Sequence, residues 1–309
     1  MKKLIFINLI FFSHQLMALC NFNLTSNAIN ETVSNINLDT AQTLTISRPN
    51  GTSYSTCSNA YFFFSKGQAG QYNRKAINSF NEVVNYNLYK NSGQFGLLKD
   101  YMDFNSVNDY ITATMQNPNV SVQSQFYFYL PASTLAATRS GIYTDNIQLN
   151  VFRGSNNSQW GYFEFTRNIP IIINVPKSIN ISLVNSGSPI DLNSTFKNLD
   201  FGDLETNEEM SFDMMIASNA GFKISFSSLN NGSLKNTINA NTISYSLKVQ
   251  GNSVNLQNSS TVPVQVASGS GVTGAAGARL PVSVKIGTVN DSLWGDYQDY
   301  ITITAATND

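Results

Sequence analysis

GDYQDYITIT, residues 295–304, is the stretch that decides the fold of this chain. From Tyr297 onward its side chains alternate between two sets, with Tyr, Asp, Ile and Ile on one face and Gln, Tyr, Thr and Thr on the other. A period of two residues is typical of a β-strand, because successive side chains of a strand point to opposite faces of the sheet. The stretch therefore predicts a strand with an isoleucine-bearing face.

The same pattern, G-x-Y-x-D-x-I-x-[IL], occurs once before, as GIYTDNIQL at residues 141–149. A second pair of stretches also matches, VNYNL at residues 84–88 and ISYSL at residues 243–247. Each member precedes its own G-x-Y-x-D motif, with 57 residues from tyrosine to tyrosine in the first case and 52 in the second. Two motifs in the same order at similar spacing predict two copies of one domain.

The two copies differ in the residues that come after them. After the first copy come a predicted strand at residues 160–165 and a last strand or strand-like connector at residues 171–173. Five residues come after the second stretch in this sequence. We therefore expect the second domain to lack its last strand, and we expect a strand from another molecule to complete it. Pro170 and Pro176 mark the end of the first domain, because proline disfavours the interior of a sheet. This gives an N-terminal domain at residues 19–175 and a C-terminal domain at residues 176–309.

Short runs rich in aromatic and β-branched residues recur along the chain, and turn residues separate them. YFFF at residues 61–64 and FKISF at residues 222–226 are typical of strands, and QGN at residues 250–252 is typical of a hairpin turn. No helical period persists over ten residues. The chain is therefore predicted to be all-β, built as two β-sandwiches. A strand and turn are also expected at residues 199–204, and a hairpin-type turn at residues 230–232.

The first 18 residues predict a secretory signal peptide. Lys2 and Lys3 form its charged start, an apolar run follows that is too short to span a bilayer, and Ala18 offers a cleavage site. Acylation of Cys20 would need a small residue before the cysteine, and Leu19 is not small. We therefore expect an exported protein rather than a lipoprotein.

Composition excludes several classes of function. His14, the only histidine, lies in the predicted signal peptide, so histidine-dependent catalysis and imidazole metal ligands are not expected. The formal net charge is −1, without a basic run, so nucleic acid is not an expected partner. Cys20 and Cys57 are the only cysteines, and a pair in an exported protein predicts one disulfide. We expect no enzyme activity, no cofactor and no metal.

Several motifs of the chain resemble those of one protein family. The first domain carries CSN at residues 57–59, Arg74, VNYNLY at residues 84–89, PA at residues 131–132 and SGIYTD at residues 140–145. The second carries LDFG at residues 199–202, residues 222–232, residues 243–247 and the 295–304 stretch. With these motifs the first domain resembles the spore coat protein U family, which supplies subunits of archaic chaperone–usher pili, and the second resembles a pilin of the same group.

The resemblance implies a concrete function. Such pilins have an immunoglobulin-like sandwich without its final strand, and a periplasmic chaperone and then the next subunit fill the gap by β-strand addition. Two domains without a donor arm imply a tip adhesin, exported through the periplasm and an outer-membrane usher to the pilus tip, where it would mediate attachment to abiotic or host surfaces and biofilm formation. Alternatives from the residues are a carbohydrate-binding lectin tip, a structural coat or matrix protein, and a secreted acid-pair hydrolase.

Two sets of site residues are expected. Apolar residues in loops outside strand periodicity are either tucked under the sandwich or exposed for binding. The surface-contact set is Leu97, Leu98, Tyr101, Met102, Leu135, Ala136 and Ala137. The strands that flank the open groove are expected to contribute Ile179, Ile181, Leu183, Ile301 and Ile303.

Overall fold

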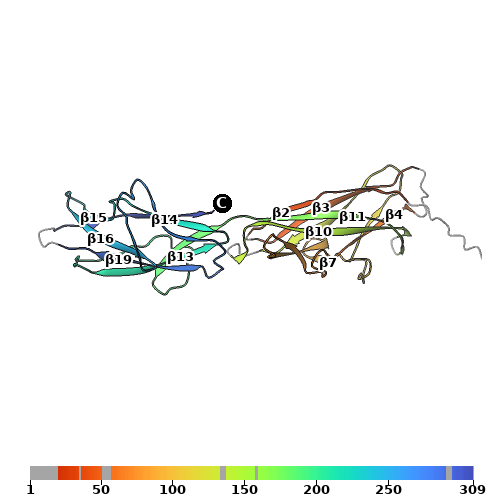
Figure 1. Cartoon of the computed structure of the whole chain (residues 1–309). Coiled ribbons are helices and arrows are strands. Elements are labelled where there is room, and N and C mark those ends of the chain that lie inside the picture. The colour runs from red at the N-terminus through yellow and green to blue at the C-terminus, as the bar shows by residue number, and fades with distance from the viewer. Residues whose placement is uncertain are drawn as a thin grey trace, which may run out of the picture.

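The computed structural model describes residues 20–34, 36–50, 57–132, 137–156, 159–289 and 294–308. The predicted signal peptide lies outside these residues, as do Leu135 and Ala136 of the surface-contact set. No helix among the described residues is long and apolar enough to cross a membrane. Every element whose bounds are described is a strand, as the sequence predicts. The strands form two groups that lie end to end, an N-terminal half (residues 20–175) and a C-terminal half (residues 177–308) (Figure 1).

The N-terminal half consists of eleven described strands, and its sheet curls back on itself. The curled sheet has two layers, and β6 takes part in both of them. Its first residues pair with β5 in one layer, and its last residues pair with β9 in the other. The path of paired strands runs β1-β3-β9-β6-β5-β10-β11-β2, and β4 and β7 pair at its sides. The strands are β1 (Asn23–Ser26), β2 (Ile29–Thr32), β3 (Leu38–Ser47), β4 (Asn59–Phe64), β5 (Arg74–Ile77), β6 (Val83–Asn91), β7 (Phe95–Leu97), β8 (Ile111–Thr114), β9 (Val122–Leu130), β10 (Gly141–Asn156) and β11 (Gln159–Val175).

Strand β4 is buried on both faces, which its run of aromatic residues explains. Phe62 and Phe64 belong to the main core between the layers, while Tyr61 and Phe63 face the opposite side. There they form a second aromatic cluster with Tyr110 and Phe152, covered by residues 98–110. The sheet of this half is therefore packed on its outer face as well as its inner face in this region.

The C-terminal half is a sandwich of two sheets. The larger sheet has the path β12-β13-β19-β16-β15-β20 with β17 beside β16, and the smaller sheet is β18-β14-β21. A single apolar cluster lies between them, with Met214 and Val282 from one sheet and Ile224 and Phe226 from the other. The strands are β12 (Ile179–Asn185), β13 (Glu209–Ser218), β14 (Phe222–Ser228), β15 (Ser233–Asn236), β16 (Thr242–Val249), β17 (Asn252–Val254), β18 (Val264–Gly269), β19 (Ala278–Ile286), β20 (Tyr297–Gln298) and β21 (Ile301–Thr307).

The two repeated motifs meet in each half of the molecule. The hydroxyl of Tyr86 donates to Asp145 Oδ2 at 2.6 Å, and the hydroxyl of Tyr245 donates to Asp299 Oδ2 at 2.6 Å. The matched spacing in the sequence therefore corresponds to a matched tyrosine–carboxylate contact. Asp299 also accepts from the backbone N–H of Tyr300, and the strand is interrupted there between β20 and β21.

The predicted turns and short strands are only partly present in the structure. Gln250 and Gly251 have positive φ values of 51° and 77° and join β16 to β17, which confirms the predicted hairpin turn. The prediction of a strand at residues 199–204 is wrong, because these residues pair with no strand. Residues 230–232 do form a turn, but it links β14 to β15 in different sheets rather than forming a hairpin. The two strands expected at residues 160–165 and 171–173 are one continuous strand, β11.

The predicted disulfide is confirmed. Cys20 and Cys57 are bonded, with a Cα–Cα separation of 5.7 Å. Both residues are buried and contact the main core of the N-terminal half. The bond joins a residue shortly before β1 to a residue shortly before β4, and the two cysteines have a sequence separation of 37.

Candidate strand-binding groove and surface cleft

The C-terminal half has two strand edges that face one another across the opening of the sandwich. β12 pairs only with β13, and β21 pairs only with β14, among the residues that the structure describes. The two edge strands come close to each other, and Lys177 Nζ donates to the backbone oxygen of Asn308 at 3.0 Å at one end. Each strand thus has one side that carries no partner strand from the described chain.

Apolar side chains between these edges reach the core but are not fully covered. Ile179 and Ile181 from β12, together with Ile301 and Ile303 from β21, pack against the core and remain partly exposed. Leu183 is 9% exposed and belongs to the core itself. The five residues expected to flank a groove lie on the two edge strands, with Ile179, Ile181 and Leu183 on β12 and Ile301 and Ile303 on β21.

One end of the β12 edge is covered by the chain itself. The N–H of Leu183 donates to the backbone oxygen of Ser194 at 2.7 Å, and the Ser194 hydroxyl donates back to the oxygen of Leu183 at 2.6 Å. No comparable bond from another described segment reaches Ile179 or Ile181. The open part of the β12 edge is therefore the part that contains the two isoleucines.

In the N-terminal half, the strand edges that correspond to β12 and β21 are both paired with β11. β11 pairs antiparallel with β10 along its length, and residues Ile171–Asn174 pair in parallel with β2 on the other side. β10 carries the first copy of the repeated motif, as β20 and β21 carry the second. Ile171 and Ile173 of β11 are fully buried as a result. The strand that seals the N-terminal half has no counterpart between β12 and β21 among the described residues.

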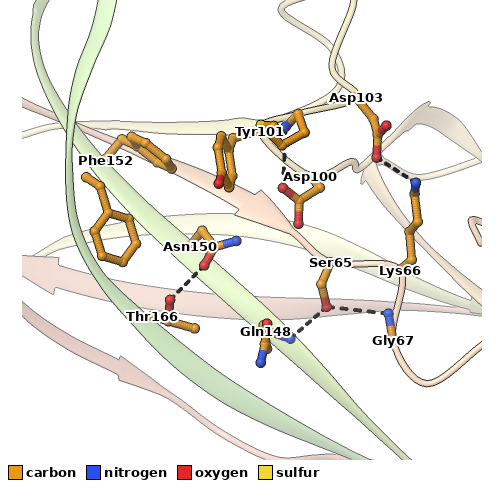
Figure 2. Close-up of a pocket in the computed structure, with 12 residues that line it drawn as sticks. Ser65, Lys66, Gly67, Asp100, Tyr101, Asp103, Gln148, Asn150, Phe152 and Thr166 are labelled. Atoms are coloured by element: carbon orange, nitrogen blue, oxygen red, sulfur yellow. Dashed lines mark hydrogen bonds and ion pairs between the residues drawn. The ribbon is translucent and has the colours of Figure 1, made fainter. Parts of the chain in front are cut away.

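A second candidate site is a cleft of about 700 Å³ on the N-terminal half. Figure 2 shows aromatic rings at one end of it, from Tyr101, Phe152 and a further ring, and polar side chains along the rest. Phe163 lies opposite Phe152 in the β10–β11 ladder, and their ring centroids are 5.5 Å apart. The lining residues are Ser65, Lys66, Gly67, Asp100, Tyr101, Met102, Asp103, Gln148, Asn150, Phe152, Phe163 and Thr166.

A buried arginine and a half-buried tyrosine hold the loop that forms one wall of the cleft. Arg74 is fully buried, and its guanidinium donates to the backbone oxygen of Leu98 at 2.7 Å and to that of Ser65 at 3.0 Å. Burial lowers the pKa of Arg74 to about 10, so the side chain stays charged at neutral pH. Tyr72 accepts from the N–H of Asp100 at 2.7 Å and donates to Asp103 at 2.8 Å. These bonds fix residues 98–103 against the end of β4.

The predicted surface-contact residues do not form one exposed patch. Leu98 is fully buried in the main core, and its backbone oxygen accepts from Arg74, so its inclusion in the set is wrong. Leu97 is partly buried at the end of β7, and Tyr101 packs on Phe152 with centroids 5.0 Å apart. Met102 is 77% exposed, and it lines the cleft with Tyr101. Ala137 is exposed, while Leu135 and Ala136 lie outside the described residues.

Sequence reasoning missed the strand residues of the cleft. Asn150, Phe152 and Phe163 come from β10 and β11, and none was among the expected site residues. Phe163 is 51% exposed although it is a phenylalanine in a strand, and the sequence alone does not show this exposure. No group of three or more metal-ligating side chains occurs among the described residues.

No family model matches the sequence, and no curated protein is significantly similar to it. Solved structures similar over most of the chain include tip adhesins. CsuE of Acinetobacter baumannii, the tip subunit of archaic chaperone–usher Csu pili, in complex with CsuC, is 13% identical over 92% of this chain and 99% of that chain, with a TM-score of 0.40. CfaE, the adhesive subunit of CFA/I fimbria of enterotoxigenic Escherichia coli, is 16% identical over 93% and 94%, with a TM-score of 0.40. The CupB6 tip adhesin of Pseudomonas aeruginosa is 11% identical over 93% and 94%, with a TM-score of 0.41. Similarity at this level assigns no function to this chain by itself.

Proposed function

We propose that this chain is a non-enzymatic tip adhesin of a chaperone–usher pilus, whose C-terminal half accepts a β-strand from another polypeptide. The observation that carries the proposal is the pair of open edges, β12 and β21, with partly exposed isoleucines between them. An extended segment placed there would bond to both edges through its backbone and bury alternate side chains in the space between the sheets. The successive occupants would be a periplasmic chaperone and then the adjacent pilin subunit.

The physical gain from such a strand is large. Four apolar side chains inserted into the groove would each contribute roughly 1.5–3 kcal/mol of burial, which sums to about 6–12 kcal/mol before any ordering cost. This is comparable with the whole stability of an ordinary domain. The C-terminal half is therefore expected to be marginally stable by itself and strongly stabilised by its partner.

We further propose that the chain is exported and that its two halves have different roles. Residues 19–175 would be the adhesive domain and residues 176–309 the strand-accepting pilin domain, behind a signal peptide at residues 1–18. The Cys20–Cys57 disulfide supports export from the cytoplasm, since disulfides persist in oxidising compartments. Passage through an outer-membrane usher would place the chain at the pilus tip, with the N-terminal domain free to attach to abiotic or host surfaces and to promote biofilm formation.

A peptide experiment tests the strand-accepting groove. The probe is a synthetic peptide with the sequence of residues 167–176, RNIPIIINVP, because its residues 169–175 seal the N-terminal half in this way. Hydrogen exchange on the full chain is followed by mass spectrometry with and without the peptide. We expect the backbone amides of β12 and β21 to exchange rapidly alone and to become protected with the peptide. A control peptide with threonine at positions 169, 171 and 173 should give no protection.

The same measurement can overturn the proposal. If β21 alone is already as protected as β10, the C-terminal sandwich is closed by its own residues and no donor strand is required. Protection that is equal with the probe and the control peptide would mean that alternate apolar side chains do not enter a groove. Either result would remove the basis for a pilus subunit.

A further inference from the structure

We propose that the cleft between β10, β11 and residues 100–103 is a binding site for a neutral sugar ring. The inference deepens the adhesin role proposed above, since it names the class of ligand that the N-terminal half would hold. The observation behind it is that one cleft has aromatic rings on one side and, on the other, polar groups that can still form hydrogen bonds with a ligand (Figure 2).

The two walls of the cleft match the two kinds of surface that a pyranose presents. A sugar ring has faces of C–H groups, which pack on aromatic rings, and a rim of hydroxyl groups, which need hydrogen-bond partners. Tyr101, which is half-buried, and Phe163, which is exposed, supply ring surface on one side. Asn150 and Asp100 supply planar polar groups on the other, and Figure 2 shows both directed toward the middle of the cleft.

The hydrogen bonds inside the protein leave groups available to a ligand. Asn150 is 8% exposed, and its Oδ1 accepts from the Thr166 hydroxyl at 2.7 Å, which orients the amide so that its NH₂ faces the cleft. The Ser65 hydroxyl oxygen accepts from the N–H of Gln148 at 2.9 Å and that of Gly67 at 3.4 Å, which leaves its O–H to donate. Asp100 accepts only one long bond through its carboxylate among the described residues, from the N–H of Met102 at 3.4 Å.

These groups form a complementary set for hydroxyls. A sugar hydroxyl donates one hydrogen bond and accepts others, so it can bridge an amide donor and a carboxylate acceptor. The cleft places the Asn150 amide and the Asp100 carboxylate on the same side of the aromatic wall. A hydrophobic surface would satisfy neither group, and burial of an unpaired polar group costs free energy. The polar side of the cleft therefore favours a hydroxylated ligand over an apolar one.

The aromatic wall is already packed against the protein in the absence of a ligand. Phe152 is 5% exposed and stands between Phe63, Tyr101 and Phe163, with centroid distances of 5.5, 5.0 and 5.5 Å. It connects the exposed rings to the buried aromatic cluster behind β4. Preorganised walls reduce the ordering cost of binding, which matters for weakly held ligands such as single sugars.

Charge and size favour a neutral ligand of one or two rings. Lys66 and Asp103 form an ion pair at 2.9 Å at the rim, so they offset each other. The carboxylate of Asp100 then gives the cleft a negative character, which opposes sialylated or sulfated sugars. A volume of about 700 Å³ lies in the range of small-ligand pockets and accommodates a monosaccharide or disaccharide.

The test uses the full chain, with and without the strand peptide described above, on an array of immobilised neutral and anionic glycans. We expect binding to neutral glycans, and the affinity for the strongest of them is then measured by calorimetry. Phe163→Ala and Asp100→Asn should each weaken that affinity at least tenfold. Phe95→Ala is the matched control, because Phe95 is 57% exposed on the same half and does not line the cleft, and it should leave the affinity unchanged.

Circular dichroism and thermal unfolding show whether each variant is folded, and only folded variants are compared. The inference is overturned if the folded chain binds no neutral glycan, or if it binds only anionic ones. It is also overturned if Phe163→Ala and Asp100→Asn bind as tightly as Phe95→Ala. A failure of the glycan test can be distinguished from a failure of the strand-peptide test, because glycan binding is measured both with and without the strand peptide.

Discussion

β10 in the N-terminal half carries the same motif as β20 and β21 in the C-terminal half, but the surroundings of β10 and β21 differ. Ile147 and Leu149 of β10 are fully buried beneath the sheet that β11 completes. Ile301 and Ile303, at the corresponding positions after the shared aspartate, remain partly exposed. The comparison teaches that the motif encodes a strand with an apolar face, whereas the presence of a neighbouring strand decides whether that face is sealed.

The two halves also differ in how they are reinforced. The N-terminal half has the Cys20–Cys57 disulfide and a second aromatic cluster outside its main core. The C-terminal half contains no cysteine and depends on the single cluster between its two sheets. We therefore expect perturbations at matched positions to affect the halves unequally, and hydrogen exchange resolved by peptide can measure each half within the full chain.

The largest expected difference comes from the disulfide. Changing Cys20 and Cys57 to serine removes a cross-link that spans 37 residues, and the loop-entropy model gives a loss of about 4 kcal/mol for a loop of that length. Hydrogen exchange should show this loss in β1 to β11 and leave β12 to β21 unchanged. An equal loss in both halves would show that they unfold as one unit.

The second difference concerns the matched isoleucines. Ile147→Ala should destabilise the N-terminal half by about 2–5 kcal/mol, because the side chain is fully buried. Ile301→Ala should cost only about 1 kcal/mol in the chain alone, since its side chain is partly exposed. Urea unfolding with the strand peptide present should increase the cost of Ile301→Ala toward that of Ile147→Ala. If the two variants cost the same without peptide, the groove is already filled.

The third difference concerns the shared tyrosine–aspartate bond. Tyr86→Phe removes a hydrogen bond to the buried carboxylate of Asp145, which should cost about 1.5–3 kcal/mol. Tyr245→Phe should cost less, because Asp299 is partly exposed and keeps the Ser228 hydroxyl as a donor at 2.6 Å. Denaturant unfolding of both variants measures the two costs. A larger loss of stability for Tyr245→Phe than for Tyr86→Phe would contradict this prediction.

The smallest expected effect is on the response to alkaline pH. Burial, together with the nearby Asp145 carboxylate, raises the pKa of Tyr86, and burial raises the pKa of Tyr61 and of Tyr143 to about 12. In the C-terminal half, burial and Asp299 raise the pKa of Tyr245. A tyrosine with a raised pKa stabilises the fold fully below about pH 10, where the unfolded side chain begins to ionise, and this contribution is lost as the pH rises.

The N-terminal half should therefore lose stability faster than the C-terminal half above about pH 10. Thermal unfolding at a series of alkaline pH values should show a decreasing midpoint, and absorbance of tyrosinate should rise with unfolding. Tyr86→Phe should reduce the slope of the midpoint against pH, with Tyr89→Phe as a control for a tyrosine of the same strand. An unchanged slope for Tyr86→Phe would contradict the assignment.

Sequence alone indicated those features that depend on local periodicity or on residue identity. The alternation in residues 295–304 predicted one strand, whereas the structure has two, β20 and β21, in different sheets, and Ile301 and Ile303 share a face of β21 as predicted. The cysteine count predicted the disulfide. The features that the sequence did not predict depend on contacts between residues distant in the chain. Leu98 looks like a loop residue available for binding, yet the buried Arg74, distant in sequence, holds its backbone against the sheet. The cleft depends on the register that sets Phe152 opposite Phe163 across a bulged ladder, which no local pattern specifies.

The connection between the halves has a mechanical consequence. β11 ends at Val175, and β12 begins at Ile179, so tension applied to the C-terminal half enters β11 lengthwise through three residues. The end of β11 that receives the load is bonded to β10 on one side and, at Ile171–Asn174, to β2 on the other. Pulling along a strand loads all these bonds together in shear instead of opening them one after another. The N-terminal half should therefore resist tension best when the force acts along β11, between its partners β10 and β2.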